Sequence, residues 1–536
     1  MDTPSMEKVK YLFNRCKTYK EDVKTELNEA FELTDTFFKI ADTGKKENQK
    51  VRNIDYTITS SRKFLANFTM SNVFNKNNRW STLEIDEGAY LANSGTGIEL
   101  GKDIIKDVNE VLEKNSDTTF RFIQSSNYYT EINKAIKDAQ IGTGIVKINK
   151  MASTVKPFSF EYQSYDNFYF CEDALGKPII AFKLHYEMNG EEATDAFSSF
   201  KGFKLPSELS ENEFDKKISI LEVMIGIFDE NTGLYQYYHA LTNDKVDTKY
   251  AEEFLDYPPF IIFRWETVKT SPWGTAPCRD YLDLFKELND NKEKRNRHRD
   301  KIVDPPINYF GNIELMYKAS LEAGAINYAG SGIAGDNLGI QPINLATNLI
   351  PIENDIREQR EAVKQAFLAQ PLGDITDPVR SATEQSLRIQ LFNKEWSGTG
   401  ELINTEVLYP VFMSCYLILD EMGILDKPEG MEDYLQFSKL SYVNELTKST
   451  GVEEVSNVLN YFNMVGSVVP EQNRQFILKP DAFAGYASEK MRIPVKILYS
   501  EEERAQMVQQ QEQERQMLLQ AQAQMGGLQN ETNGQI

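Results

Sequence analysis

The stretch from Ser271 to Asp304 constrains the fold most, because its helical pattern continues after its apolar residues end. It opens on Pro272, Gly274 and Pro277, which predict a turn, and a proline fits the first turn of the helix that follows. Apolar residues then recur at spacings of three and four, at Tyr281, Leu284, Phe285 and Leu288. This spacing predicts a helix with one buried face.

The second half of this helix, residues 289–301, contains no apolar residue and nothing that breaks a helix. A spacing of four predicts two ion pairs, Asp290 with Lys294 and Glu293 with Arg297. A helix that is polar all round is solvated, relies on charge pairs, or contacts other subunits. Residues 292–301 carry six bases and two acids, a local charge of +4 in a chain of net charge −22. Two hypotheses follow: a solvated charged helix, or a basic strut that faces nucleic acid or an acidic neighbour.

Length and cysteine usage restrict the class of protein. The 536 residues suggest about three or four domains, with ample chain for a buried core. The cysteines are widely separated and lack a CxxC spacing, so we expect free thiols and a reducing compartment: Cys16, Cys171, Cys278 and Cys415. The first residues lack a signal pattern, and no run of about 18 apolar residues occurs. These features predict a cytosolic protein that is not inserted in a membrane.

The net charge of −22 argues against a general nucleic-acid-binding protein, which normally presents a basic face. A local basic site remains compatible with it. An acidic surface would also let DNA slide past without binding, because lysine and arginine contacts to phosphate supply most non-specific affinity.

Hydrophobic periodicity predicts a mixed α+β chain that is mainly helical. Before residue 120, helical spacing predicts helices at about residues 7–41, Asn53–Val73 and Gly97–Lys114, and Trp80–Ile85 predicts a short strand. From Phe120 to Glu266 the period becomes that of strands, although Tyr129–Ala139 is typical of a helix. The predicted strands are Ile145–Ile148, Ser159–Tyr162, Phe168–Phe170, Ile179–Tyr186, Ile218–Phe228 and Leu234–Leu241.

Beyond the central helix, Pro305 and Pro306 end helical structure, because proline lacks a donor and restricts the residue before it. Residues 307–350 are rich in Gly and Asn and predict a compact irregular or β subdomain, bracketed by a second helix at Ile352–Leu368. The sequence next predicts a tight loop at Gln370–Pro378 and a long helix from Ser381, with irregularities at Gly398, Gly400 and Pro410. A small helical region around Val452–Val468 is predicted within Glu432–Ile493. The Gln-rich tail is predicted to be helical over Glu501–Gln524 and flexible from Gly526.

Patterns that carry catalysis are weak in this sequence. The histidines His185, His239 and His298 are too few and too scattered to predict a metal cluster or a catalytic triad. A GxGxxG pattern at residues 330–335 lacks the preceding strand and following helix that a dinucleotide site needs. We therefore predict no catalytic residue, no metal site and no cofactor, and we do not expect an enzyme.

Three segments carry the most specific patterns of the chain: TSSRKFLANFTMSNVFNKNNRW (Thr59–Trp80), PWGTAPCRDYLDLFKELN (Pro272–Asn289), and SATEQSLR (Ser381–Arg388) with the long helix that ends in ELINTEVLYPVF. These segments resemble the portal, or head-to-tail connector, proteins of short-tailed, podovirus-type bacteriophages. The Gln-rich end is also similar to the family. The segments occur in the family's order and at comparable spacing, so the resemblance covers nearly the whole chain.

The resemblance implies a portal fold with wing, stem, clip and crown regions. Its expected boundaries are a wing at 1–275, a first stem helix at 276–303, a clip at 304–351, a second stem helix at 352–369, a channel loop at 370–380, a kinked wing helix at 381–428, a crown at 429–500, and a Gln-rich C-terminal helix and tail at 501–536. Twelve side-by-side stems would give the polar helix the neighbours that it lacks within one chain.

The resemblance also implies a function and partners. Twelve copies would form a ring around a channel for double-stranded DNA at the unique vertex of the virion capsid, after assembly in the host cytoplasm. The implied partners are the terminase packaging ATPase, tail adaptor proteins, major capsid and scaffolding proteins, and internal core proteins, with no membrane. Twelve copies at −22 each total −264, which favours a mostly non-adhesive channel with narrow basic rings.

For this function we predict two sets of site residues. Lys292, Arg295 and Arg299 would contact phosphates or neighbouring subunits, and the channel loop would contain Gln370, Pro371, Leu372, Gly373 and Asp374. Two alternatives stay open. One is another virion structural protein, such as a scaffold or tail tube, and the other is a metal-dependent nucleic-acid-processing enzyme, which would need a metal-binding carboxylate cluster.

Overall fold

The fold is given by a computed structural model that describes residues 3–35, 55–76, 79–86, 88, 102–198, 200–206, 209, 215–229, 233–311, 320–330, 339–343, 348–369, 398–428, 434–442, 454–464, 483 and 486–487. The chain divides into two compact units, Met1–Asn444 and Glu445–Ile536, and each is described by itself. In the second unit, residues 454–464 are helical. The first unit combines helices with strands, which confirms the predicted α+β class.

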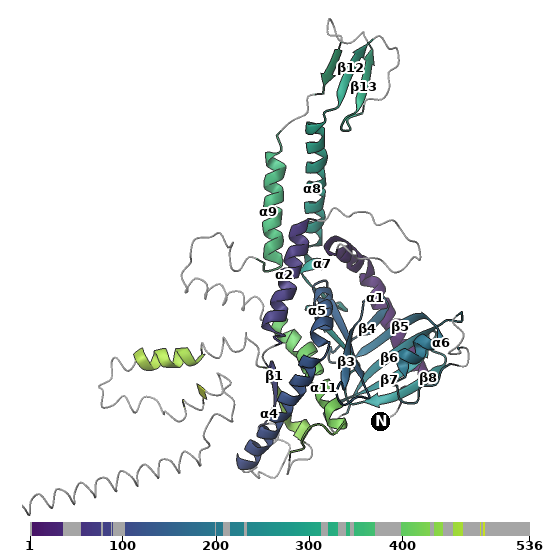
Figure 1. The fold of residues 1–536 in the computed structure, drawn as a ribbon, viewed down its shortest axis with the longest axis vertical. Helices are drawn as coiled ribbons and strands as arrows, with labels where there is room; N and C mark the ends of the chain where they lie inside the picture. The colour runs from purple at the N-terminus through teal and green to yellow at the C-terminus, as the bar shows by residue number, and fades with distance from the viewer. Residues whose placement is uncertain are drawn as a thin grey trace, which may run out of the picture. The chain divides into compact units, whose positions relative to one another are not determined.

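A five-stranded antiparallel sheet follows the order of the chain: β4 (Phe168–Cys171), β5 (Ile180–Met188), β6 (Ile218–Phe228), β7 (Tyr235–Asn243) and β8 (Lys249–Leu255) (Figure 1). Alternate residues of β6 point to opposite faces. Leu221 and Val223 pack with the apolar side of α1 (Met6–Thr34), whereas Ile220 packs with α6 (Gly190–Phe197). The strands β4 to β7 confirm predicted runs, but α6 was not predicted.

A second, three-stranded sheet has the order β3-β2-β9, with β2 (Thr143–Lys150) in the centre between β3 (Phe158–Tyr162) and β9 (Phe260–Arg264). Helix α5 (Tyr128–Ala139) lies close against it, since a Cβ on Gly144 would come within 2.5 Å of the Ala135 carbonyl oxygen. Beyond β9, the hairpin β10 (Glu266–Val268) and β11 (Ser271–Thr275) follows. The turn predicted from Pro272, Gly274 and Pro277 is therefore a strand over Ser271–Thr275.

Helix α4 (Lys102–Ser125) continues well past its predicted end at Lys114. The polar residues that follow do not break it, because tertiary and backbone contacts satisfy them. The Asn115 side-chain amide donates to the Tyr416 hydroxyl at 3.2 Å and to the Asp426 carbonyl at 2.7 Å. The Ser116 hydroxyl donates to the carbonyl one turn earlier. Periodicity alone could not reveal these partners.

Strand β1 (Ser81–Ile85) confirms a prediction and pairs with a strand that was not predicted. Its partner, β15 (Ser438–Tyr442), lies antiparallel to it, with Leu83 opposite Leu440. The sequence predicted a small helical region within Glu432–Ile493, around Val452–Val468; the helix at residues 454–464 confirms its centre, whereas Ser438–Tyr442 at its start form a strand. The backbone of β1 supplies the hydrogen bonds that these residues would otherwise have made within a helix.

The helix Gly398–Glu421 contains a π-helical turn, Asn404–Leu408, directly before α11 (Tyr409–Glu421). Pro410 stands in the first turn of α11 and cannot donate a backbone hydrogen bond, which confirms the irregularity predicted there. Among the described residues this helix is long and apolar enough to cross a membrane, with a mean hydropathy of 1.5. However, 61% of its apolar window is buried inside the protein, as in the core helix of a globular domain.

Two helices bracket a small sheet, as predicted. Helix α8 (Leu282–Val303) leads to β12 (Ile307–Gly311), β13 (Ile326–Gly330) and β14 (Gly339–Pro342), and α9 (Ile350–Ala366) returns beside α8 (Figure 1). Strand β12 is central, parallel to β13 and antiparallel to β14. Helix α9 ends where Leu368 adopts a left-handed φ of 52°.

The predicted helix at the start of this region is broken into two. A short helix, α7 (Pro277–Asp280), precedes α8, and Tyr281 between them is 44% exposed. Tyr281 therefore does not belong to the predicted buried face, although Phe285 and Leu288 do. The predicted loop Gln370–Pro378, the helix start at Ser381 and the tail from Glu501 lie outside the described residues.

Candidate functional site

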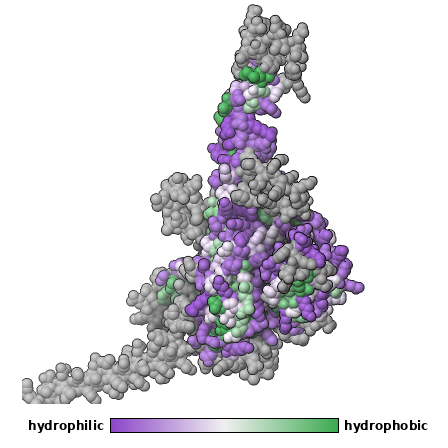
Figure 2. All heavy atoms as spheres, turned by 45° about the vertical axis from the view of Figure 1, so that its right-hand side comes forward, coloured by the Kyte–Doolittle hydropathy of each residue, from purple (hydrophilic) through white to green (hydrophobic). Residues whose placement is uncertain are grey.

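Helix α8 is anchored at one end and covered by charge at the other. Within this helix, which is described throughout, only Phe285 and Leu288 are buried, and the Phe285 ring stacks on that of Phe367 with centroids 5.8 Å apart. Figure 2 shows hydrophilic residues over most of the helix pair. Both predicted ion pairs are present, Asp290 with Lys294 at 2.5 Å and Glu293 with Arg297. Because these pairs are exposed, each stabilises the helix by only about 0.3–0.5 kcal/mol.

A buried carboxylate joins α8 to two other helices. Asp55 is 1% exposed and accepts the Thr57 backbone N–H at 2.9 Å, so it caps α2 (Tyr56–Asn72). Its Oδ2 lies 2.9 Å from Arg360 Nη2 of α9 and 3.6 Å from Lys292 Nζ of α8. Its backbone N–H donates to Asn289 Oδ1 at 2.9 Å. Three helices therefore meet at one charged residue.

The charge of Asp55 is held in place by these contacts. Burial alone would raise the pKa of Asp55, but hydrogen bonds from Arg360 and Thr57 outweigh burial and lower the pKa to about 2. The carboxylate is therefore ionised throughout the physiological pH range.

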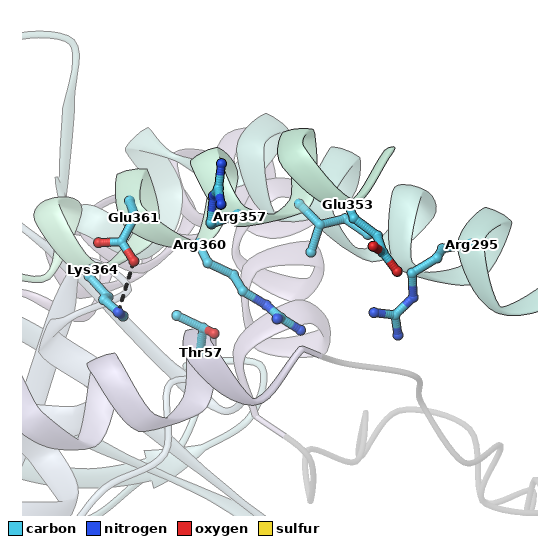
Figure 3. Close-up of a pocket in the computed structure, with 8 residues that line it drawn as sticks. Thr57, Arg295, Glu353, Arg357, Arg360, Glu361 and Lys364 are labelled. Atoms are coloured by element: carbon cyan, nitrogen blue, oxygen red, sulfur yellow. Dashed lines mark hydrogen bonds and ion pairs between the residues drawn. The ribbon is translucent and has the colours of Figure 1, made fainter. Parts of the chain in front are cut away.

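A cavity of about 520 Å³ opens beside this junction (Figure 3). Its lining includes four cations and two anions, a local charge of +2: Arg295, Arg357, Arg360, Lys364, Glu353 and Glu361. Lys364 pairs with Glu361 at 3.0 Å, and Arg357 donates to the Asn354 amide oxygen at 3.2 Å. Two helices thus present guanidinium groups to one hollow, a geometry that suits phosphate or carboxylate oxygens.

The three predicted basic residues lie in different environments. The Lys292 side chain is 12% exposed and faces Asp55, with its Nζ 5.3 Å from the centre of the Tyr56 ring. Arg295 lines the cavity and donates to Asn296 Oδ1 at 3.0 Å. The Arg299 side chain is 58% exposed and lies 3.5 Å from Asp300. The predicted channel-loop residues Gln370, Pro371, Leu372, Gly373 and Asp374 lie outside the described residues.

The basic residues of α9 were missed in the sequence. Arg357, Arg360 and Lys364 follow one another at spacings of three and four, which places them on one face of the helix. That spacing was visible in the sequence and could have indicated the cavity. The contribution of Asp55 could not have been found from such a spacing, because 234 residues separate Asp55 from Asn289, which accepts its backbone N–H.

A second group of ionisable residues lies in the core between the two larger sheets. Glu222 of β6 is fully buried, and its carboxylate contacts Lys147 Nζ of β2 at 2.8 Å, His239 Nε2 at 2.9 Å and His185 Nε2 at 3.0 Å. His239 Nδ1 also lies 3.0 Å from Glu253. This Glu222 cluster faces a cavity of about 1060 Å³.

The two histidines of the Glu222 cluster lie far apart in the sequence, and their shared carboxylate was not foreseen. Burial alone would raise the pKa of Glu222, but Lys147 and both imidazoles hold that pKa well below its usual range. Burial alone would lower the pKa of His239, yet its two carboxylate partners raise it. Among the described residues, no group of three or more His, Cys, Asp or Glu side chains is arranged to hold a metal ion. The cluster is therefore an ion network that joins two sheets.

The family of bacteriophage head to tail connecting proteins matches residues 6–488, and the chain belongs to this family. It is thus a structural protein of the phage virion, of the portal or connector class, located at the capsid vertex. No curated protein matches the chain significantly.

Proposed function

We propose that the chain is a portal protein, twelve copies of which form a ring at the unique capsid vertex. The ring would surround a channel through which double-stranded DNA enters during packaging and leaves during ejection. It would also attach the terminase ATPase and the tail adaptor proteins, and contact capsid, scaffolding and internal core proteins.

The observation that carries this proposal is the helix pair α8 and α9. In our assignment α8 and α9 are the stem, and the sheet β12 to β14 is the clip. Apart from Phe285 and Leu288 no residue of α8, which is described throughout, is buried, and apolar side chains stay exposed at the sheet-facing ends of the pair, with Val303 at 78% and Ile350 at 64%. Neighbouring copies would cover these residues and offer charges to the polar surface.

Within the stem, we assign contacts with phosphate or a neighbouring subunit to Arg295 and Arg299. Lys292 was predicted with them, but it already contacts Asp55 of its own chain. We therefore assign Lys292 the role of holding α8 against α2.

A charge-reversal experiment tests this assignment. Arg295→Glu with Arg299→Glu should leave ring assembly intact and lower genome packaging on the order of tenfold, because each change replaces attraction to phosphate with repulsion. The matched control is Lys294→Glu with Arg297→Glu, which makes the same charge change on the opposite face at 100° per residue. A normal genome yield from the first pair, or an equal loss from the control, would count against the assigned roles.

Native mass spectrometry of the purified chain tests the ring itself. A closed assembly of twelve supports the proposal. Lone molecules would contradict it, as would a closed assembly that electron micrographs show to lack a central hole, and a different subunit number would favour a scaffold or tail tube. A nuclease activity that EDTA abolishes would favour a nucleic-acid-processing enzyme.

A further inference from the structure

Two of the four cysteines lie against each other in the core. All four are buried free thiols, and Cys16 of α1 and Cys171 of β4 have their Sγ atoms 2.8 Å apart. Both residues are fully buried, and 155 positions separate them in the sequence. Cys278 in α7 and Cys415 in α11 lie in other helices. The fold therefore distinguishes one pair of thiols from the remaining two.

The packing on both sides of the pair holds these thiols together. The ring of Phe13 lies 5.5 Å from that of Tyr169 and 5.2 Å from that of Phe182. One turn beyond Cys16, the buried Lys20 Nζ donates to the Tyr165 carbonyl at 2.7 Å and lies 4.5 Å from the centre of the Tyr169 ring. Helix α1 is thus joined to the strand that carries Cys171 before and after the thiol contact. The sulfurs cannot separate while these contacts persist.

The two sulfur atoms lie closer together than an ordinary non-bonded contact. A disulfide S–S bond measures about 2.05 Å, so the two sulfurs would need to approach by less than about 1 Å. The thiol of Cys16 donates its hydrogen bond to Cys171, and this contact lowers the pKa of Cys171. Cys171 is accordingly the better nucleophile of the two.

We propose that Cys16 and Cys171 form a redox pair, which stays reduced during assembly and closes to a disulfide when the virion meets an oxidising medium. The inference uses the virion location that the family gives and does not depend on the ring of twelve. The oxidant is a small peroxide, which can enter the core through local opening.

The reaction balances in two steps. The Cys171 thiolate attacks hydrogen peroxide, an S–O bond forms, the O–O bond breaks, and the leaving hydroxide is protonated to water. The Cys16 thiol then attacks the sulfenyl sulfur, the S–S bond forms, the S–O bond breaks, and the departing hydroxide takes the proton of the Cys16 thiol and leaves as a second water. Two thiols lose two electrons and two protons, and one peroxide is reduced to two waters.

The disulfide would connect the first helix of the chain to the five-stranded sheet across a long loop. Closing a long loop restricts the unfolded chain more than closing a short one. We expect oxidation to raise the thermal midpoint by about 4–16 °C. A virion would then carry a more stable connector than the one assembled in the cell.

Thiol counting on the purified full-length protein tests the pair. Native protein is treated with hydrogen peroxide, denatured in N-ethylmaleimide, and weighed by mass spectrometry. Wild type should bind four maleimides before oxidation and two after it, with four restored by a phosphine reductant, and a non-reduced digest should link Cys16 to Cys171. In Cys16→Ala the link cannot form, so Cys171 should instead be trapped as a sulfenic acid by dimedone. The matched control, Cys278→Ala, should still form the link.

The outcomes separate clearly. Four maleimides after a dose that fully oxidises free glutathione, or a link between any other pair, would overturn the inference. An unchanged midpoint on oxidation would remove the stabilising role. If Cys16→Ala fails to fold, the wild-type count and Cys171→Ser decide the question. Native mass spectrometry of the oxidised and reduced protein before it is denatured reports the ring separately, so failure of the disulfide and failure of the proposed function are distinguishable.

Discussion

Replacing Glu222 by Gln should destabilise the junction between the two sheets. The substitution preserves shape but removes the carboxylate that Lys147, His185 and His239 share. Lys147 is 8% exposed, so its ammonium group would remain buried next to a neutral amide. Breaking a buried ion pair by removing one partner costs about 3–5 kcal/mol. The Gln oxygen can still accept one hydrogen bond, which places the cost near the lower value.

Thermal unfolding measures this cost. A loss of about 3 kcal/mol corresponds to about 6–12 °C in the midpoint for a cooperative unit of 150–250 residues. The companion variant Glu222→Leu with Lys147→Met removes both charges and should recover most of the loss, because apolar replacement of a buried pair is often close to neutral. The reasoning is refuted if Glu222→Gln melts within about 2 °C of wild type, or if the double variant is no more stable than Glu222→Gln.

Two further predictions concern pH. Because the pKa of His239 is raised in the folded state, its contribution to stability is complete below its ordinary value of 6.5 and is lost as pH rises through the folded value; the midpoint of wild type should therefore fall more than that of His239→Gln between pH 6.5 and 9. Asp55→Asn keeps the helix cap but loses the ion pairs, which should cost about 2 kcal/mol of stability at pH 7. Because the folded pKa of Asp55 is about 2 instead of 3.8, the stabilities of wild type and variant should converge as pH falls through 2. Urea midpoints measure both effects.

The sequence pattern was sufficient to predict a helix or strand wherever the residues of that element alone determine its structure. The run Ile218–Phe228 coincides with β6 because apolar side chains fill both faces of that strand. The polar half of α8 and its two ion pairs were predictable because neighbours at a spacing of four are set by helix geometry. The two helices that bracket the small sheet were predictable from the spacing of their apolar residues.

Contacts between distant residues were beyond sequence reasoning. Arg264 at the end of β9 is nearly buried and donates its backbone N–H to Glu406 Oε2 of the π-helical turn at 2.8 Å, although 142 residues separate them. The Glu222 cluster combines β2, β5, β6, β7 and β8, and no spacing indicates that combination. For the candidate site, the sequence indicated Arg295 but not the α9 guanidinium groups that share its cavity.

The pairing of β1 with β15 has a consequence for synthesis on the ribosome. Ser81 pairs with Tyr442, which is synthesised 361 residues later (442 minus 81). At about 5–20 residues per second, the ribosome needs roughly 20–70 s to reach it. During that interval β1 presents an open edge to other nascent chains. The N-terminal half is therefore vulnerable to wrong association until the chain is nearly finished, and early termination before residue 438 would leave that edge permanently open.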